Sequence, residues 1–325
     1  MSNRNKLSFE LERRITRLAI AVVLLLALAF APTLPASENV AQPPFAYWAD
    51  VPAEGQFVLG AVYEQSKSYQ IWADGKQYSV KVMAQGENYG IDIRQGYFAL
   101  QYGITEKWAA DLEIGGTTVG WRSFSPGNSI QSTTGLMDPS LGVRYQLFKE
   151  ADYTNSPWVP TLTFRAGAVL PGTYDQDFVY APGFRSAAIE PELLLRKHFS
   201  WPGLGAYADA LYRWNMTTEN DNYMVAVGAF QQVKGWELDA GYLHLQTLSG
   251  GNITFGTPGD LSTIVYPRQV REIYDAIQAG FSYTTSKLHW KYGFFSTVVV
   301  AGNNTDNKPW FGASIDIPFG GKHEK

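Results

Sequence analysis

Two pairs of acidic residues have a spacing that suits acid–base chemistry. Glu190 and Glu192 stand two positions apart, as do Glu237 and Asp239, so on an extended strand both members of a pair point to the same side. Because such pairs are common on strands that line a water-filled interior, we expect neither pair to be catalytic.

His244 offers a second possibility, since Ser249 and Asn252 follow it closely. These residue types suggest the nucleophile set of a lipid hydrolase, in which Ser and His must lie at hydrogen-bond distance. The Gly250-Gly251 stretch beside them gives no reason to expect that alignment. The other three His are scattered and Cys is absent, so we expect no metal site, no cofactor and no enzymatic activity.

Composition excludes several classes of protein. The chain has 325 residues, of which 14% are aromatic, and a formal charge of only −4, whereas disordered chains are poor in aromatic residues and rich in net charge. The absence of Cys excludes a disulfide scaffold. An acidic balance also argues against a nucleic-acid partner, which would require a basic patch to neutralise phosphates.

The N-terminus predicts export. A basic head that includes Arg13, Arg14 and Arg17 precedes an uninterrupted apolar run over residues 18–30, which is too short to span a membrane and has the length of a secretory signal. We expect a signal peptide over residues 1–36, with cleavage near Ala36, and a periplasmic segment over residues 37–55. No second apolar stretch of membrane length follows, so we expect no transmembrane helix in the exported chain.

The rest of the chain reads as strands with alternating polar and apolar residues. Over residues 108–115, for example, Trp108, Ala110, Leu112 and Ile114 fall on one face, and the charged residues fall on the other. Twelve such runs follow one another, although the runs at residues 56–66, 90–102 and 223–232 do not reveal which face is apolar.

The connections between these runs alternate between long and short, and the short ones always fall on the same side. Trp108, Trp158, Trp201 and Trp236 flank the short connections, as expected where a bilayer meets water. Alternation alone would also suit a soluble β-sandwich, but the coincidence of these features with a signal peptide is not expected there. We therefore predict an all-β fold, a transmembrane antiparallel up-and-down β-barrel of about twelve strands of the bacterial outer-membrane type. It would span residues 56–319 and leave a C-terminal tail at 320–325.

The alternation also predicts which charged residues face the interior of the barrel. Acidic and basic side chains tend to stand one strand apart, where they can pair. They either hold a narrow barrel together as ion pairs or form an electric field that selects solutes. The predicted interior residues are Asp111, Glu113, Arg144, Arg165, Glu190, Glu192, Arg196, Asp209, Arg213, Glu237, Asp239, Lys291 and Asp316.

Three sequence blocks carry a family resemblance. They are Tyr-Gly-Ile-Thr-Glu-Lys-Trp at 102–108, Gly-Leu-Met-Asp-Pro-Ser-Leu-Gly-Val-Arg-Tyr at 135–145, and Val-Leu-Pro-Gly-Thr at 169–173. In this order they resemble the outer-membrane barrels of the meta-pathway-of-phenol-degradation family, a group of proposed transporters. The resemblance covers roughly residues 97–175. It implies passage of small aromatic or hydrophobic molecules across the outer membrane, and it brings no catalytic residues.

We therefore expect a passive outer-membrane channel for small solutes. The alternatives are a structural or adhesion barrel with a plugged lumen, and the lipid hydrolase considered above. The expected partners are outer-membrane lipid and lipopolysaccharide, the barrel-assembly machinery and a small-molecule solute. The connection at residues 249–273 contains more apolar residues than an exposed loop should, so it either folds inward as a constriction or packs over the rim.

Overall fold

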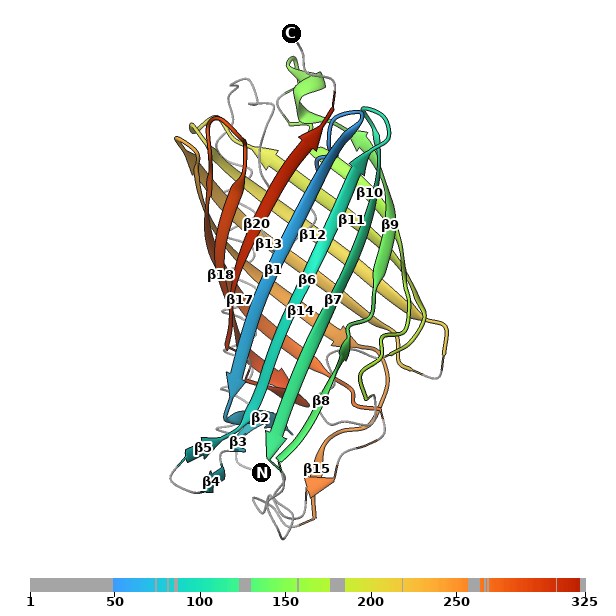
Figure 1. Cartoon of the computed structure of the whole chain (residues 1–325), viewed down its shortest axis with the longest axis vertical. Helices are drawn as coiled ribbons and strands as arrows, with labels where there is room; N and C mark the ends of the chain where they lie inside the picture. Colours follow the sequence, from blue (N-terminus) through green and yellow to red (C-terminus); the bar gives the residue numbers. More distant parts are fainter. Residues whose placement is uncertain are drawn as a thin grey trace, which may run out of the picture.

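The chain forms a closed β-barrel in a computed structural model (Figure 1). Residues 1–48, which include the predicted signal peptide, lie outside the described part of the chain. The described residues are 49–73, 75–80, 82–84, 87–122, 130–156, 158–175, 185–217, 219–256, 264–265, 267, 269–307 and 309–321.

Antiparallel pairing runs without interruption around the barrel. β1 pairs with β6 on one side and with β20 on the other, which closes the sheet. β8 and β9 both pair with β7, so together they form one wall strand with a break at residues 137–139. The predicted twelve-stranded antiparallel barrel is thereby confirmed. Its strands are β1 (Gln56–Ser68), β6 (Ile91–Gly103), β7 (Trp108–Arg122), β8 (Ile130–Leu136), β9 (Ser140–Phe148), β10 (Thr161–Val169), β11 (Ala188–His198), β12 (Leu204–Asn215), β13 (Asn222–Val233), β14 (Trp236–Thr247), β17 (Ile273–Thr284), β18 (Lys291–Asn303) and β20 (Pro309–Gly320).

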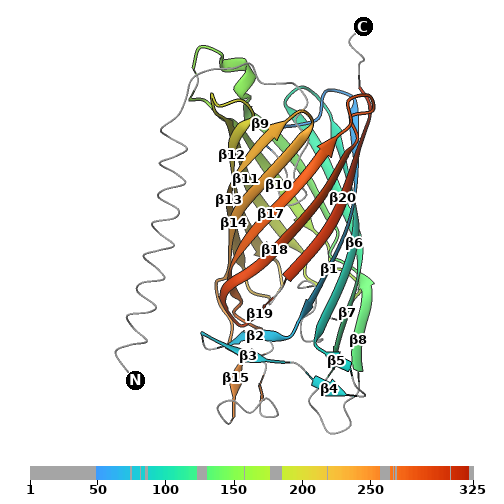
Figure 2. The ribbon, with the colours of Figure 1, turned by 90° about the vertical axis from the view of Figure 1, so that its left-hand side faces the viewer.

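Tight turns gather at one end of the barrel, which we assign to the periplasm because barrels of this class have short periplasmic turns. The tightest joins β13 to β14 through Lys234 and Gly235, whose φ angles of 50° and 86° suit the two-residue turn of a twisted hairpin. The connection between β9 and β10 is longer than expected, because it contains the 3-10 helix η1 (Glu150–Tyr153). Figure 2 shows η1 at the end opposite β2 to β5.

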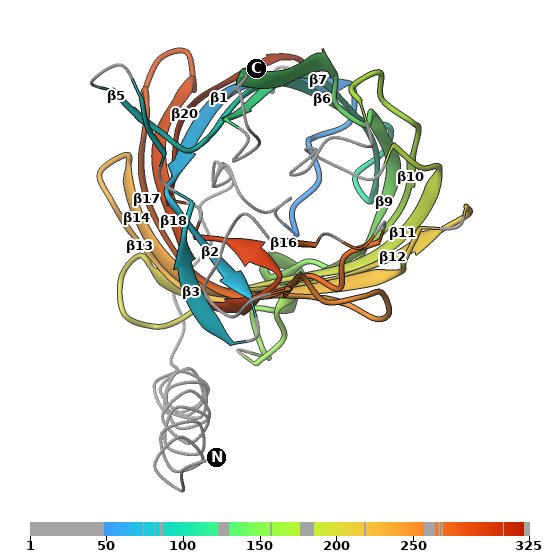
Figure 3. The ribbon, with the colours of Figure 1, turned by 90° about the horizontal axis from the view of Figure 1, so that it is seen from below.

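The other end carries the long connections, several of which form small sheets of their own. β19 (Thr305–Asp306), β2 (Gln70–Ala73) and β3 (Lys76–Ser79) make a three-stranded sheet. Figure 3, seen from this end, shows β2 and β3 lying across one side of the opening. The expected long connection at residues 120–135 is mostly strand, because β7 and β8 extend far beyond the neighbouring β10. The remaining short strands are β4 (Val82–Ala84), β5 (Glu87–Tyr89), β15 (Thr254–Phe255) and β16 (Ile264–Val265).

The outward face of the barrel is apolar. Leu112, Phe164 and Phe294 are all exposed on this face, as are Trp108, Trp236 and Phe319 near the periplasmic end. An exposed apolar surface of this extent is unfavourable in water and favourable against lipid. Among the described residues, no helix is long and apolar enough to span a membrane.

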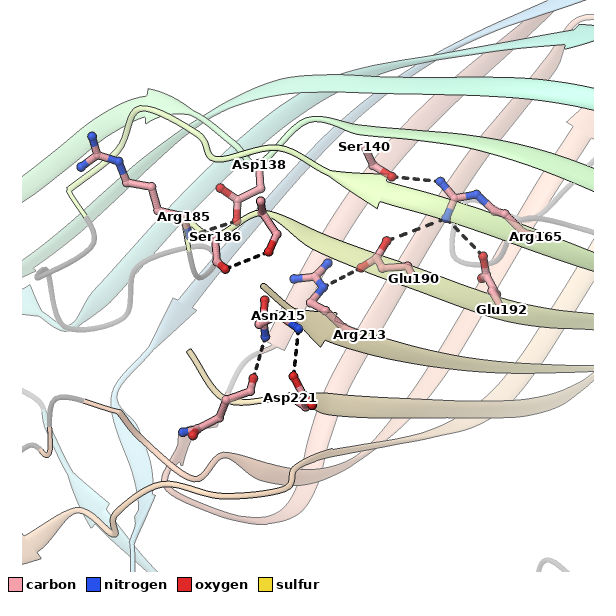
Figure 4. A network of polar contacts seen from close by, with 12 residues as sticks. Asp138, Ser140, Arg165, Arg185, Ser186, Glu190, Glu192, Arg213, Asn215 and Asp221 are labelled. Carbon is pink, nitrogen blue, oxygen red and sulfur yellow. Dashed lines mark hydrogen bonds and ion pairs between the residues drawn. The ribbon is translucent and has the colours of Figure 1, made fainter. Parts of the chain in front are cut away.

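The connection from β10 to β11 covers the edge of β8 that β10 does not reach. The Thr173 amide donates to the Leu136 carbonyl at 3.0 Å, and the Leu136 amide donates to Thr173 Oγ1 at 2.9 Å. Asp138, at the break between β8 and β9, accepts hydrogen bonds from the Gly172 amide and the Tyr174 hydroxyl at 2.7 and 2.9 Å. Figure 4 shows the Asp138 carboxylate turned toward the same connection. The extracellular part of the wall is therefore completed by a loop.

Glu150 fastens η1 to the end of β11. Its carboxylate pairs with Lys197 and accepts hydrogen bonds from the His198 amide at 3.0 Å and from the His198 ring at 3.1 Å. Burial alone would raise the pKa of Glu150, but the hydrogen bonds from His198 and Lys197 outweigh it and hold the pKa below its ordinary value. A depressed carboxyl pKa stabilises the fold above the unfolded pKa, and this stabilisation is lost as pH falls through the folded pKa.

We therefore expect Glu150→Gln to lower the urea midpoint of unfolding in lipid vesicles at neutral pH. The difference from the parent chain should shrink below about pH 4, where the carboxylate is protonated in the unfolded state. Asp152→Asn, an exposed position in the same helix, serves as the control. If Asp152→Asn lowered the urea midpoint as much as Glu150→Gln does, Glu150 would not have the fastening role described above.

A charge placed on the outward face should be costly. Leu112→Arg, on β7 at a side chain that is 44% exposed, is expected to lower the free energy of unfolding by about 2–4 kcal/mol, because the guanidinium faces hydrocarbon. Trp158→Arg, in the periplasmic connection, should lower it by only about 0–1 kcal/mol. Urea titrations in lipid vesicles measure both values. Equal costs would show that Leu112 does not face the membrane.

Candidate functional site

All thirteen charged residues predicted for the interior lie on inward-facing positions of the wall. Strand alternation places them opposite the exposed apolar residues, and most are buried. Their part in a solute path remains a prediction. By strand they are Asp111 and Glu113 on β7, Arg144 on β9, Arg165 on β10, Glu190, Glu192 and Arg196 on β11, Asp209 and Arg213 on β12, Glu237 and Asp239 on β14, Lys291 on β18, and Asp316 on β20.

Arg165 is the centre of the largest ionic network. Its guanidinium lies 2.8 Å from Asp111, 3.5 Å from Glu192 and 3.8 Å from Glu190, and it donates to Ser140 Oγ at 2.9 Å. Figure 4 shows its contacts with Ser140, Glu190 and Glu192. The side chain is only 1% exposed. Four strands are therefore held together by one cation.

Two glycines make room for this guanidinium. A Cβ at Gly142 would lie 2.6 Å from Arg165 Nε, and a Cβ at Gly167 would lie 2.6 Å from Arg165 Nη1. Both are closer than real Cβ contacts, so only glycine lets the guanidinium lie flat against β9 and β10. Glycine at these two inward positions thus leaves the space in which the Arg165 guanidinium lies.

The other interior cations are also paired. Arg144 Nε lies 3.3 Å from Asp111 Oδ1, Arg213 Nε donates to Glu190 at 2.5 Å, and Lys291 Nζ donates to Glu237 at 3.1 Å. Arg144–Asp111 and Arg213–Glu190 are pairs between neighbouring strands, as the sequence predicted, whereas Lys291 reaches Glu237 across β17. The interpretation as wall-bracing ion pairs agrees with these contacts.

The start of the described chain lies inside the periplasmic end of the barrel. The Ala49 carbonyl accepts hydrogen bonds from Gln146 Nε2 at 3.0 Å and from the Thr163 hydroxyl, and Ala49 is 1% exposed. The Asp50 carboxylate pairs with Arg196. The sequence predicted a periplasmic segment over residues 37–55, and Ala49 and Asp50 of this range contact inward-facing residues at the periplasmic end of the barrel. They satisfy inward polar groups that would otherwise lack partners.

Two apolar clusters lie toward the extracellular end of the interior, among inward polar residues that include Ser66, Thr117 and Thr247. Inward-facing Ile91, Ile93 and Val119 pack against Ile71 and Val80 of the covering connection. A second cluster joins inward-facing residues of β13, β14, β17 and β18, with Trp72 of β2 packed against it. Its buried members are Ala226, Leu243, Ala276 and Val299.

The connection at residues 249–273 packs over the rim, in the part that the structure describes. Ile253 is buried, and its amide donates to Asn304 Oδ1 at 2.9 Å. The Phe255 ring lies 4.3 Å from the Tyr78 ring of β3. The alternative left open by the sequence is thereby decided for these residues, which contact neighbouring connections.

Sequence reasoning missed Glu64 on β1, which faces inward beside Gln95 of β6. Its strand is apolar or small on both faces over residues 57–63, so alternation gave no signal there. Tyr207, which is buried on the inward face of β12, was missed because an aromatic residue in an alternating strand is expected to face lipid.

The structure does not assemble the hydrolase set that His244 suggested. His244 faces outward, and its Nδ1 lies 2.7 Å from Asp275 Oδ1. Ser249 donates instead to Asn220 at 2.5 Å, and Asn252 accepts a hydrogen bond from Asn304 at 2.9 Å. Within the described ranges, no group of three His, Asp or Glu is placed to hold a metal ion.

Comparison with solved structures identifies the fold. The COG4313 outer membrane channel from Pseudomonas putida F1 is similar with a TM-score of 0.64 over 86% of this chain and 100% of that chain, at 13% identity. The protein has the fold of an outer-membrane β-barrel. The KdgM porin and a mutant of the monoaromatic hydrocarbon channel TodX give TM-scores of 0.44 and 0.40, at 10% and 11% identity. They cover 81% and 82% of this chain, and 99% and 91% of their own.

No family model matches the sequence, and no curated protein matches it either. The likeness to solved structures is therefore one of fold. Together with the apolar outward face, this fold places the protein in the bacterial outer membrane.

Removing the Arg165 guanidinium from its ionic network should destabilise the barrel. Arg165→Met leaves Asp111, Glu190 and Glu192 with fewer partners, and breaking a buried ionic pair in this way costs about 3–5 kcal/mol. The urea-unfolding free energy in lipid vesicles should fall by that amount. Adding Glu192→Gln to Arg165→Met should recover part of the loss. A double variant as unstable as the sum of the two singles would contradict the network.

Proposed function

We propose that the protein is a passive outer-membrane channel for small apolar or amphipathic solutes, aromatic ones included. The observation that carries this proposal is the pair of apolar clusters on the interior wall toward the extracellular end. Porins for polar solutes have a polar interior throughout. Inward-facing Ile91, Val119, Leu243 and Val299 would be unfavourable in a purely aqueous path.

An apolar lining favours solutes that themselves leave water. Each apolar Å² removed from water contributes about 25 cal/mol, so a small aromatic ring gains affinity from this lining that a sugar does not. The family resemblance of residues 97–175 supports the same solute class. The charged residues nearer the periplasm would then line a polar exit, where Ala49 and Asp50 stand in the path.

The apolar outward belt supports contact with outer-membrane lipid and lipopolysaccharide. The closing strand β20 alternates regularly and ends near Phe319, which supports recognition by the barrel-assembly machinery. Both partners follow from the membrane location and are independent of the solute.

Isosteric substitutions on β18 test the solute class. Val299 is inward and buried, whereas its neighbour Val300 is outward and exposed. In planar bilayers, we expect small current steps that phenol reduces at concentrations about tenfold lower than arabinose does, a difference of about 1.4 kcal/mol. Val299→Thr should weaken the reduction by phenol, and Val300→Thr should leave it unchanged.

Two outcomes would overturn the proposal. Absence of current steps together with absence of solute uptake into liposomes would show a barrel that conducts nothing, as the structural alternative predicts. Equal sensitivity to phenol and arabinose would show that the apolar lining does not select the solute. Retention of the folded barrel in each variant is checked by its heat-dependent migration on gels.

A further inference from the structure

The wall of the barrel carries more acidic than basic groups on its inward face. Nine carboxylates face five basic side chains on the wall strands. The five basic groups all pair with carboxylates. One of these carboxylates is Asp50, which precedes β1 and is not on the wall. The wall strands therefore carry more inward-facing carboxylates than cations, and some carboxylates share a cation with others.

Asp239 is the clearest of these groups. It is 7% exposed on the inward face of β14, and its Oδ1 atom has no hydrogen-bond partner. Its neighbour Glu237, in contrast, accepts hydrogen bonds from Lys291 at 3.1 Å and from Gln232 at 2.7 Å. Lys291 is within electrostatic reach of Asp239, but it donates to Glu237 and also attracts Asp316, so one cation serves three carboxylates. A buried carboxylate that shares its countercharge in this way would be stabilised by a further cation.

Aromatic rings flank this carboxylate. Phe230 of β13 is the direct cross-strand partner of Asp239, and it packs with Tyr207 of β12 as a buried pair. The Tyr207 hydroxyl reaches the inward face of β14, where it lies 2.4 Å from the position of a Cβ at Gly241. Tyr207 also lies within electrostatic reach of Asp209, Glu237 and Asp239.

A second acidic group stands on the other side of Tyr207. Asp209 lies two residues along β12, is 2% exposed and has a partnerless Oδ1 atom, while its carboxyl group shares a hydrogen bond with Glu192. Glycines on neighbouring strands accommodate these side chains. A Cβ at Gly280 would lie 2.6 Å from Asp239 Oδ2, and a Cβ at Gly228 would lie 2.4 Å from the Tyr207 ring.

Carboxylates combined with aromatic faces recognise organic ammonium groups, through charge pairing and cation–π attraction. We propose that Asp239, Asp209, Tyr207 and Phe230 form a site for the ammonium group of a small amphipathic amine. This proposal deepens the proposed function and rests on it. A solute that enters from the extracellular end brings its apolar part past Leu243 and Val299. It then meets the acidic site closer to the periplasm on the same wall.

Calorimetric titration of the purified protein in detergent micelles tests the site directly. The probes are benzylammonium chloride, benzyl alcohol and sodium benzoate, which share a ring and differ in charge, in a buffer with KCl in large excess over the probe. We expect benzylammonium to bind at least tenfold more tightly than the other two. Benzylammonium binding that is abolished by the potassium in the buffer would overturn the proposal.

Three substitutions locate the site. Asp239→Asn is expected to weaken benzylammonium binding at least tenfold, and Asp209→Asn to weaken it by a smaller factor. Glu64→Gln removes an equal charge on the inward face of β1, four strands from β14 in the sheet order, and should weaken binding less than threefold. Equal losses in Asp239→Asn and Glu64→Gln would indicate only the general field of the interior and would overturn the proposed site.

The outcomes separate this inference from the channel proposal. If phenol reduces the current as expected but benzylammonium binds no better than benzyl alcohol, the ammonium site is wrong and the channel for apolar solutes stands. If benzylammonium binds with the expected pattern but no solute crosses the barrel, the site stands and the channel proposal fails. Gel migration confirms that each variant is folded.

Discussion

The whole structure depends on the need to pair every backbone amide and carbonyl in a layer that contains no water. A sheet meets this need in hydrocarbon only when its first strand returns to its last, as β1 does with β20. Closure then forces an inside and an outside onto every strand, because successive side chains alternate. The apolar belt, the interior charges and the glycines beside Arg165 all follow from that separation.

This dependence explains how much the sequence could predict. Alternation is a local signal, so it placed all thirteen charged residues, from Asp111 on β7 to Asp316 on β20, on the inward face. It failed where both faces of a strand are small or apolar, as around Glu64. It also could not place Ala49 and Asp50, since their positions result from contacts with Gln146, Thr163 and Arg196, which lie far away in the sequence. Contacts between residues far apart in the sequence produce no periodic pattern of residue types that could predict them.

The interior contains two kinds of region, which differ in what holds them. Toward the extracellular end, the covering connection packs Ile71 and Val80 onto wall residues. Elsewhere on the wall, Arg165 and its acidic partners span four strands. The inward-facing carboxylates also outnumber the basic side chains of the wall strands.

The loop that covers β8 has a consequence beyond the single barrel. β7 and β8 rise past β10, so one edge of β8 would present free amides and carbonyls above the membrane. Bare edges of this kind invite a strand from another molecule to join the sheet. The Thr173 amide donates to the Leu136 carbonyl, and the Thr173 hydroxyl accepts from the Leu136 amide. The Asp175 amide donates to Thr133 Oγ1 at 2.8 Å. The loop thus removes this edge as a template on which a strand of another barrel could add.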